Sequence, residues 1–314
     1  MNRIVVNIPL NYVQKAVVAI GNFDGVHIGH QQLFAILNKI AARKNYRRIA
    51  ITFEPLPREY FSDQKQQQRL PRLSLLRDKF YLLNNLIDEL IVVHFNSAIA
   101  NLTPAQFIQN VLQRELNVAE AVFGHDFKFG KNGLGSSIDL IEHGIECTMV
   151  DPVVIKGMRV SSSIVRNFAH NNDLDSIRQY LGHNLHYTSR IVHGNKMGRK
   201  FGVPTINLTL GRNRLALWGI YVVNVYINNI RYNAVASIGK NPTTNDLDVF
   251  KLEAHLLDVD LNLYGKIATV EILEFVRKEQ KFDDLASLFA QIHKDMDYAK
   301  NYFKKLFSQD KNGL

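Results

Sequence analysis

The stretch AVVAIGNFDGVHIGH, residues 16–30, decides the fold of the first half of the chain. AVVAIGNF is an apolar run typical of a buried strand, and from about residue 28 to residue 43 apolar residues recur at the spacing of one helix face. His27 and His30 therefore stand where a strand gives way to the amino terminus of a helix. Backbone N–H groups and the helix dipole favour anions there, and Gly29 between the histidines lets a nucleotide approach closely. The stretch predicts a phosphate site at which both imidazoles can lie over one phosphate.

Around this stretch, apolar runs alternate with helical patterns, which is typical of a parallel sheet covered by helices. We therefore expect a doubly wound α/β domain over residues 1–184. Its further strand candidates are RRIAITF (47–53), ELIVVHF (89–95), AEAVFG (119–124) and ECTMVDPV (146–153).

Beyond about residue 185 strand candidates follow one another without intervening helices, which favours a small antiparallel barrel or sandwich. An apolar stripe between residues 285 and 306 then predicts a terminal helix. We expect this second domain to span residues 185–314. Its strand candidates are LHYTSRIVHG, VPTINLTL, GIYVVNVYI, IRYNAVASIG, FKLEAHLLDV and KIATVEILEFV.

Composition sets the outer limits of the function. A length of 314 residues favours two domains, and no apolar run approaches the roughly 18 residues of a membrane span. The first residues lack the pattern of a secretion signal, so we expect a cytoplasmic protein. Cys147 is the only cysteine, which excludes an internal disulfide and a multi-cysteine zinc site. A net charge of +9 fits nucleic acid, a membrane surface or nucleotides equally well.

A second phosphate-binding element is VSSSIVR, residues 160–166. Serine hydroxyls and N–H groups that open a helix, with Arg166 one turn later, can hold a phosphate, although serines in this position often serve only as a cap. Together with His-Ile-Gly-His, the segment resembles the Ser-Ser-Thr-x-Ile-Arg motif of the adenylyltransferases in the nucleotidyltransferase superfamily, whose fold is Rossmann-like. This chain has Ser163 where that motif has Thr, and Val165 where it has Ile.

Two more stretches resemble flavin-binding motifs of one family in that superfamily, the bacterial bifunctional riboflavin kinases and FAD synthetases. TFEPLP (52–57) is similar to its Phe-x-Pro-x-Pro strand end, and FGHDFKFGK (123–131) is similar to its Gly-x-Asp-Phe-x-Phe-Gly loop. An aromatic loop can stack a planar ring, and core packing of Phe127 and Phe129 is the rival interpretation. The resemblance implies that an FMN phosphate attacks the α-phosphorus of ATP, which gives FAD and pyrophosphate.

For this first reaction the resemblance implies three sets of residues, of which the first two overlap. They are His27, His30, Ser162, Ser163 and Arg166 for catalysis; Gly21, Phe23, Gly29, His30, Ser162 and Arg166 for ATP; and Asp24, Phe53, Pro55, Pro57, Asp126, Phe127 and Phe129 for the flavin.

The second half carries VHGNKMGRKFGVPTIN, residues 192–207, in which glycines and cations can wrap nucleotide phosphates. Its Pro-Thr-x-Asn resembles the Pro-Thr-Ala-Asn signature of riboflavin kinases, whose kinase domain is a small β-barrel. Thr205 and Asn207 alternate along a strand, so their oxygens lie on one side and can both ligate Mg²⁺. We expect Gly194, Lys196, Gly198, Arg199, Thr205 and Asn207 to bind ATP.

Glu253, in LEAHLLD, matches the catalytic glutamate of that family and is our candidate base for the 5′-hydroxyl of riboflavin. Without the resemblance, a glutamate on the solvent face of a strand would be the simpler interpretation. Asn241, in SIGKNPT (237–243), is a candidate flavin contact together with Glu253, although Thr244 stands where the family has Phe.

The resemblance implies Mg²⁺ as cofactor, ATP as co-substrate, and riboflavin, FMN and FAD as substrates and products. We expect a monomer with no nucleic-acid or membrane partner. Residues 196–200 superficially resemble the lysine loop of class I aminoacyl-tRNA synthetases, but they lead into strands rather than into a helical region. Two further interpretations are a basic barrel that binds nucleic acid and a chain in which only one of the two sites works.

Overall fold

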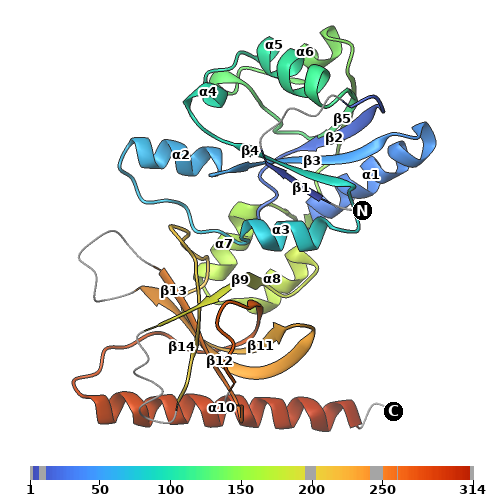
Figure 1. Ribbon diagram of the computed structural model, residues 1–314. Coiled ribbons are helices and arrows are strands. Elements are labelled where there is room, and N and C mark those ends of the chain that lie inside the picture. The colour runs from blue at the N-terminus through green and yellow to red at the C-terminus, as the bar shows by residue number, and fades with distance from the viewer. Residues whose placement is uncertain (1–2, 7–11, 195–202, 241–249, 260, 312–314) are drawn as a thin grey trace. The chain divides into compact units, whose positions relative to one another are not determined.

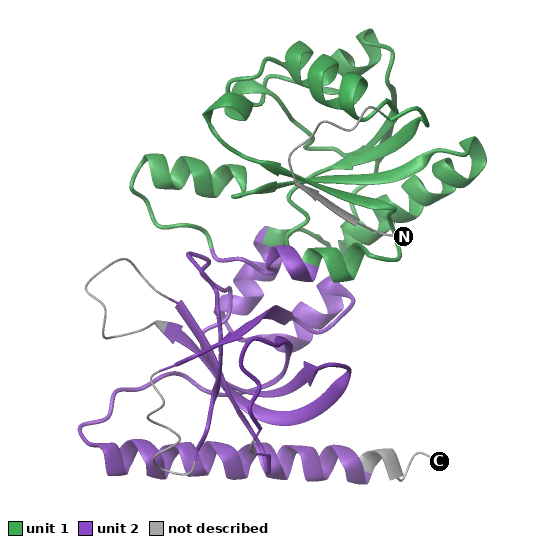
Figure 2. Ribbon diagram, in the orientation of Figure 1, with its two compact units in different colours: residues 1–70, 79–162 green, residues 71–78, 163–314 purple. Residues whose placement is uncertain are grey.

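The computed structural model describes residues 3–6, 12–194, 203–240, 250–259 and 261–311 (Figure 1). The chain divides into two compact units, the first formed by residues 1–70 and 79–162 and the second by residues 71–78 and 163–314 (Figure 2). Residues 163–184 thus group with the second unit, whereas our domain boundary at 184/185, which stays a prediction, assigns them to the first domain.

The first unit contains the expected parallel sheet. Its strands are β1 (Arg3–Val6), β2 (Ala16–Ile20), β3 (Arg47–Glu54), β4 (Glu89–His94), β5 (Val118–Gly124) and β6 (Glu146–Val150), in the order β1-β4-β3-β2-β5-β6. The central strands are apolar along both faces because helices cover both faces. From β2 the chain runs outward through β3 and β4, and it then returns to place β5 on the other side of β2. Ligands bind in such sheets at the carboxyl ends of the strands where the order reverses, here β2 and β5.

Helices and short elements surround this sheet. Helix α1 (Ile28–Lys44) buries Leu33, Phe34 and Leu37. Asn45 caps its carboxyl end, and the left-handed backbone of this residue (φ 54°) closes the last turn. The other elements are α2 (Pro57–Gln64), α4 (Ser97–Ala100), α5 (Pro104–Phe107), a π-helix (Ile108–Glu115), a 3₁₀ turn (Lys131–Gly133), α6 (Ser137–Glu142) and a hairpin of β7 (Val154–Ile155) and β8 (Met158–Arg159). Helix α3 (Leu76–Leu83) begins in the residues that group with the second unit.

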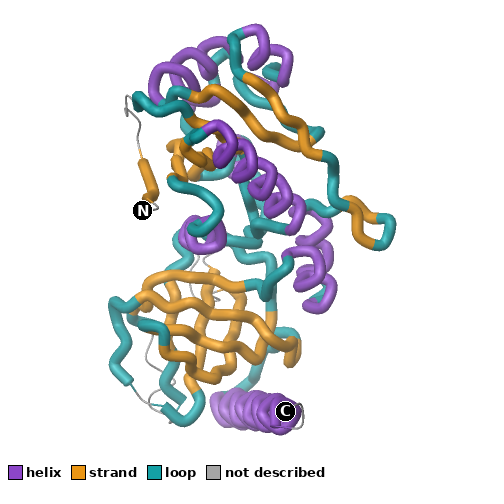
Figure 3. Tube along the Cα trace, turned by 90° about the vertical axis from the view of Figure 1, so that its right-hand side faces the viewer, coloured by secondary structure: helices purple, strands orange, loops and turns teal. Residues whose placement is uncertain are grey.

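In the second unit, six antiparallel strands close into a barrel (Figure 3). Of the two expected forms, barrel and sandwich, the barrel is therefore confirmed. Going round the barrel the order is β10-β13-β12-β11-β14-β9. The strands are β9 (His186–Val192), β10 (Ile206–Leu208), β11 (Gly219–Ile227), β12 (Ile230–Lys240), β13 (Phe250–Leu256) and β14 (Ile267–Arg277). The unit also contains α8 (Leu174–Leu181), α10 (Leu285–Lys311) and, except for its first residue, α7 (Ser162–His170).

The expected terminal helix is confirmed as α10, which packs on the outside of the barrel. Val222 of β11 joins Ala299 and Phe303 of α10 in one apolar cluster. Asp295 of α10, which is buried, accepts hydrogen bonds from the guanidinium of Arg277 at 2.7 to 3.1 Å. Among the helices that the structure describes, we find none with the length and apolar character needed to cross a membrane.

Candidate active sites

The two histidines of the first unit are held by the turn between β2 and α1. His27 is the N-cap of α1, and its Nδ1 accepts a hydrogen bond from the backbone N–H of His30 at 3.3 Å. The turn passes through left-handed backbone at Phe23, Gly25 and Val26. As a result the two imidazoles stack with their centroids 3.6 Å apart and their planes 14° apart. Both rings stand at the positive end of a helix of four to five turns, which is suited to an anion.

His30 is a neutral imidazole at neutral pH. Burial lowers its pKa well below the ordinary value of a histidine, and the charges of His27 and Lys79 lower it further. Its Nδ1 is buried and has no hydrogen-bond partner within the described residues. A neutral imidazole offers one N–H donor and one acceptor, so His30 can still donate to an anionic oxygen.

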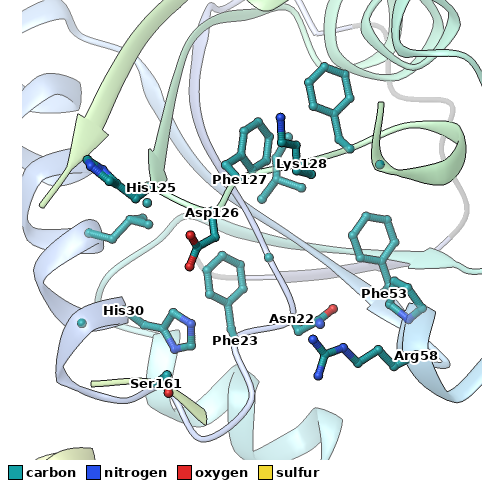
Figure 4. Close-up of a pocket in the computed structure, with 18 of the residues that line it drawn as sticks. Asn22, Phe23, His30, Phe53, Arg58, His125, Asp126, Phe127, Lys128 and Ser161 are labelled. Carbon is teal, nitrogen blue, oxygen red and sulfur yellow. The ribbon is translucent and has the colours of Figure 1, made fainter. Parts of the chain in front are cut away.

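A cavity of about 850 Å³ opens over these histidines (Figure 4). Figure 4 shows His30 and Ser161 at one side of it and Phe53 and Arg58 at the opposite side. Such a volume suits an elongated nucleotide ligand. The expected residues that line the cavity are Gly21, Phe23, His27, Gly29, His30, Phe53, Pro57, Asp126, Phe127 and Phe129.

Other residues of the predicted site lie outside this lining. Asp24 is buried, and its backbone carbonyl accepts a hydrogen bond from Ser162 Oγ at 2.8 Å, within the first unit. Pro55 follows β3 and does not face the cavity. Ser163 and Arg166 belong to the second unit, where Arg166 Nε donates to the carbonyl of Pro71 at 2.7 Å.

Aromatic rings form the wall of the cavity away from the histidines. Phe127 stacks on Phe123 with a centroid distance of 4.7 Å and on Phe129 at 5.4 Å. Phe127 and Phe129 also pack against the core of the sheet, so they serve in the core and in the cavity wall at once. Phe53 meets Phe95 edge to face at 5.7 Å. These rings can enclose a flat aromatic ligand.

Sequence reasoning missed Asp151 and three cations among the residues that line this cavity. Arg159, at the end of β8, forms an ion pair with Asp126 at 2.6 Å. Arg58 and Lys128 line the cavity, are exposed, and form no ion pair within the described part of the chain. Arg58 follows Pro57, and Lys128 lies inside FGHDFKFGK, so their position next to recognised motifs was the available signal.

In the barrel, strand register brings the predicted kinase residues together. Glu253 on β13 pairs with Asn207 on β10 and with Ser237 on β12, so the three side chains form a row across neighbouring strands. Their neighbours Leu252 and Ile206 are buried in the barrel, which leaves the row on the outer face. Lys251 Nζ lies 3.5 Å from the Glu253 carboxylate.

Gly194 lies directly against Asn207, one member of this row. A Cβ added to Gly194 would lie 2.4 Å from Asn207 Nδ2, so glycine at this position allows the Asn207 amide to lie where it does. Thr205 is partly exposed beside the buried Ile206, as the alternation predicts. No cluster of three or more acidic, His or Cys side chains that could hold a metal occurs within the described residues. Lys196, Gly198, Arg199 and Asn241 lie outside the described residues.

Comparison with known families defines the class of the protein. Residues 11–164 match the family model of FAD synthetase, and residues 181–303 match that of riboflavin kinase. The chain therefore combines a nucleotidyltransferase and a kinase in the order that the sequence predicted.

Curated relatives then define the family. A bifunctional riboflavin kinase/FMN adenylyltransferase of Haemophilus influenzae is 36% identical over 297 residues, which cover 93% of this chain and 95% of the relative. That of Bacillus subtilis is 34% identical over 299 residues, covering 93% and 94%. This chain belongs to the family of bifunctional riboflavin kinase/FMN adenylyltransferases, an assignment that confirms the predicted resemblance and the two activities.

The fold is also shared with a solved structure. A protein from Streptococcus pneumoniae, described as a macrolide-efflux protein, matches with a TM-score of 0.76 and 28% identity, over 95% of this chain and 99% of the other. The match extends over both units of this chain.

Proposed function

We propose that the cavity of the first unit is the site of FAD formation, and the stacked His27 and His30 at the start of α1 are the observation that carries this proposal. An oxygen of the FMN phosphate attacks the α-phosphorus of ATP, the new P–O bond forms, and the bond to the leaving pyrophosphate breaks. No protein nucleophile takes part. The histidines and the N–H groups of α1 stabilise the charge that grows on the α-phosphate.

Ser162, Ser163 and Arg166 form the second phosphate contact of this reaction in our proposal. The hydrogen bond from Ser162 to Asp24 supports the assignment of Ser162, because this bond fixes the serine beside the histidine turn within the first unit. The flavin ring lies against Phe127 and Phe53, and Asp126 is fixed there by Arg159. Arg58, a cation of the cavity without an ion pair in the described chain, lies with Phe53 at the side away from His30 and is suited to the carbonyl oxygens of the flavin ring.

Riboflavin phosphorylation takes place on the outer face of the barrel. Glu253 accepts the proton of the 5′-hydroxyl, the oxygen of this hydroxyl forms a bond to the γ-phosphorus of ATP, and ADP leaves. The row formed by Glu253, Asn207 and Ser237 supports this assignment, because it sets a carboxylate next to an amide oxygen.

Mg²⁺ fits the donor set of the kinase site. Thr205 Oγ1 and Asn207 Oδ1 are the hard oxygen donors that would hold it, and a site with few protein ligands is usual where ATP phosphates complete the coordination. When bound, the ion neutralises charge on these phosphates. Gly194 supports the assignment of Asn207, because its lack of a side chain leaves room for the amide.

The remaining expectations are also part of the proposal. The partners are small molecules, namely riboflavin, FMN and ATP, and the protein acts as a monomer in the cytoplasm. The domains meet at residues 184 and 185, and neither nucleic acid nor a membrane is a partner.

The test is to incubate the purified chain with riboflavin, ATP and Mg²⁺ and to separate the flavins by chromatography over time. FMN that rises first, followed by FAD, is the expected result. FMN alone would refute the role of the first unit. No flavin nucleotide at all, even with added FMN, would refute both assignments.

A further inference from the structure

Glu279 follows the end of β14, and its carboxylate contacts the barrel. One carboxylate oxygen accepts a hydrogen bond from Trp218 Nε1 at 2.6 Å, and the other accepts from Ser237 Oγ at 3.2 Å. A Cβ added to Gly239 would lie 2.0 Å from Glu279 Oε1, so the carboxylate rests directly on the backbone of β12. Two donors and a glycine thus hold an exposed glutamate at one place on the barrel.

This place continues the row of kinase residues. Ser237 is the member of the row on β12, next to Glu253 on β13, and its hydroxyl donates to Glu279. Neighbouring strands are about 4.8 Å apart, so the Glu279 carboxylate, which lies against Ser237 and Gly239 of β12, is about one strand spacing from the strand that carries Glu253.

Glu279 has capacity for further hydrogen bonds. A carboxylate offers about four acceptor sites, and the described contacts use two of them. The residue is exposed, so the other acceptor sites face solvent. The substrate of this site carries donors to match, because the ribityl chain of riboflavin bears hydroxyls on successive carbon atoms that lead away from the 5′-hydroxyl.

We propose that Glu279 contacts the substrate of the kinase reaction, accepting hydrogen bonds from ribityl hydroxyls while Glu253 receives the 5′-hydroxyl. This inference rests on the proposed kinase role of Glu253. It makes Glu279 a determinant of specificity for the polyol rather than for the flavin ring.

The experiment compares full-length Glu279→Gln with the wild-type chain. Gln keeps the size of the side chain but removes its charge, which weakens each hydrogen bond that it accepts. We expect the KM for riboflavin to rise about tenfold and kcat to change less than about threefold. Lumiflavin, which has the ring but a methyl group in place of the ribityl chain, should inhibit both proteins with the same Ki.

Two more variants complete the test. Gly239→Ala should raise the KM for riboflavin as well, because the new Cβ displaces the Glu279 carboxylate and the end of a flexible side chain moves at little cost. Glu274→Gln removes a carboxylate from β14 itself and should leave the KM unchanged.

Three results would overturn the inference. They are an unchanged riboflavin KM in Glu279→Gln, an unchanged KM in Gly239→Ala, and a lumiflavin Ki that rises in parallel with the KM, which would place the effect at the ring through Trp218. A wild-type chain that makes no FMN would instead refute the proposed function, so the two failures are distinct.

Discussion

Replacing Gly194 with alanine should stop the kinase and spare the adenylyltransferase. The new Cβ would lie 2.4 Å from Nδ2, 2.6 Å from Cγ and 2.8 Å from Oδ1 of Asn207, whereas ordinary contacts begin at 3.4 Å. The amide must therefore move by about 1 Å (3.4 − 2.4 Å). The Asn207 backbone cannot follow, because it pairs with Val192 on one side and Glu253 on the other. A misplacement of 1 Å in a reacting assembly costs about 100-fold in rate.

The assay follows FMN formed from riboflavin and, separately, FAD formed from added FMN. We expect FMN formation to fall about 100-fold and FAD formation to keep its wild-type rate, because the cavity of the adenylyltransferase is built from the first unit. Asn207→Ser removes the atoms that clash, so adding Gly194→Ala to this variant should cost less than about threefold more. FMN formation within threefold of wild type in Gly194→Ala would refute the reasoning, as would an equal loss in both backgrounds.

Four other changes test the two sites. His27→Ala should reduce FAD formation at least about 100-fold while FMN accumulates, because a donor to the α-phosphate is lost; chromatography of the flavins that shows FAD at the normal rate would remove His27 from the site. Glu253→Gln should stop riboflavin phosphorylation but leave added FMN convertible to FAD, and normal FMN production would contradict its role as base. Arg58→Gln should raise the KM for FMN and the Ki of riboflavin in FAD formation in parallel, each about tenfold, whereas Arg43→Gln, on the exposed face of α1, should change neither; a rise of the KM for FMN alone would place Arg58 at the phosphate instead of the ring. Because the folded-state pKa of His30 lies below its unfolded value, the unfolded chain binds more protons below pH 6.5, and stability falls as the pH drops. In urea unfolding followed by circular dichroism, the free energy of unfolding of the wild type should fall by up to about 1.0 kcal/mol more than that of His30→Asn between pH 6.5 and 5.5, and equal losses would exclude this effect.

Local sequence patterns were sufficient to predict most of the strands and helices. GIYVVNVYI coincides with β11, and the apolar run that starts at Ala16 coincides with the start of β2, because buried strands need continuous or alternating apolar residues wherever they lie. The choice between barrel and sandwich depended instead on the pairing of β9 with β14 and β10. The pairing of β9 with β14 joins segments that are distant in sequence, so no local pattern could have decided between barrel and sandwich. The same holds for β1, a short edge strand that pairs only with β4 within the described sheet.

Motif spacing predicted many of the residues that line the cavity but not its charged residues outside the motifs. The histidines, Phe53 and Phe127 line one cavity because β2, β3 and β5 end at the same edge of the sheet. Arg159 was missed, since its ion pair with Asp126 joins the end of β8 to the loop after β5, which are remote in sequence. Glu279 was missed for a similar reason, because only the closed barrel brings the end of β14 over Gly239 of β12.

Trp218 is the only tryptophan in the chain, and its indole N–H is held by Glu279. Fluorescence excited selectively at tryptophan therefore comes entirely from the barrel unit, although Tyr and Phe residues occur throughout the sequence. Unfolding of the barrel can thus be recorded alone by tryptophan emission, while circular dichroism records both units. A denaturation experiment on the intact protein, without truncation or labelling, can separate the stability of the kinase from that of the adenylyltransferase.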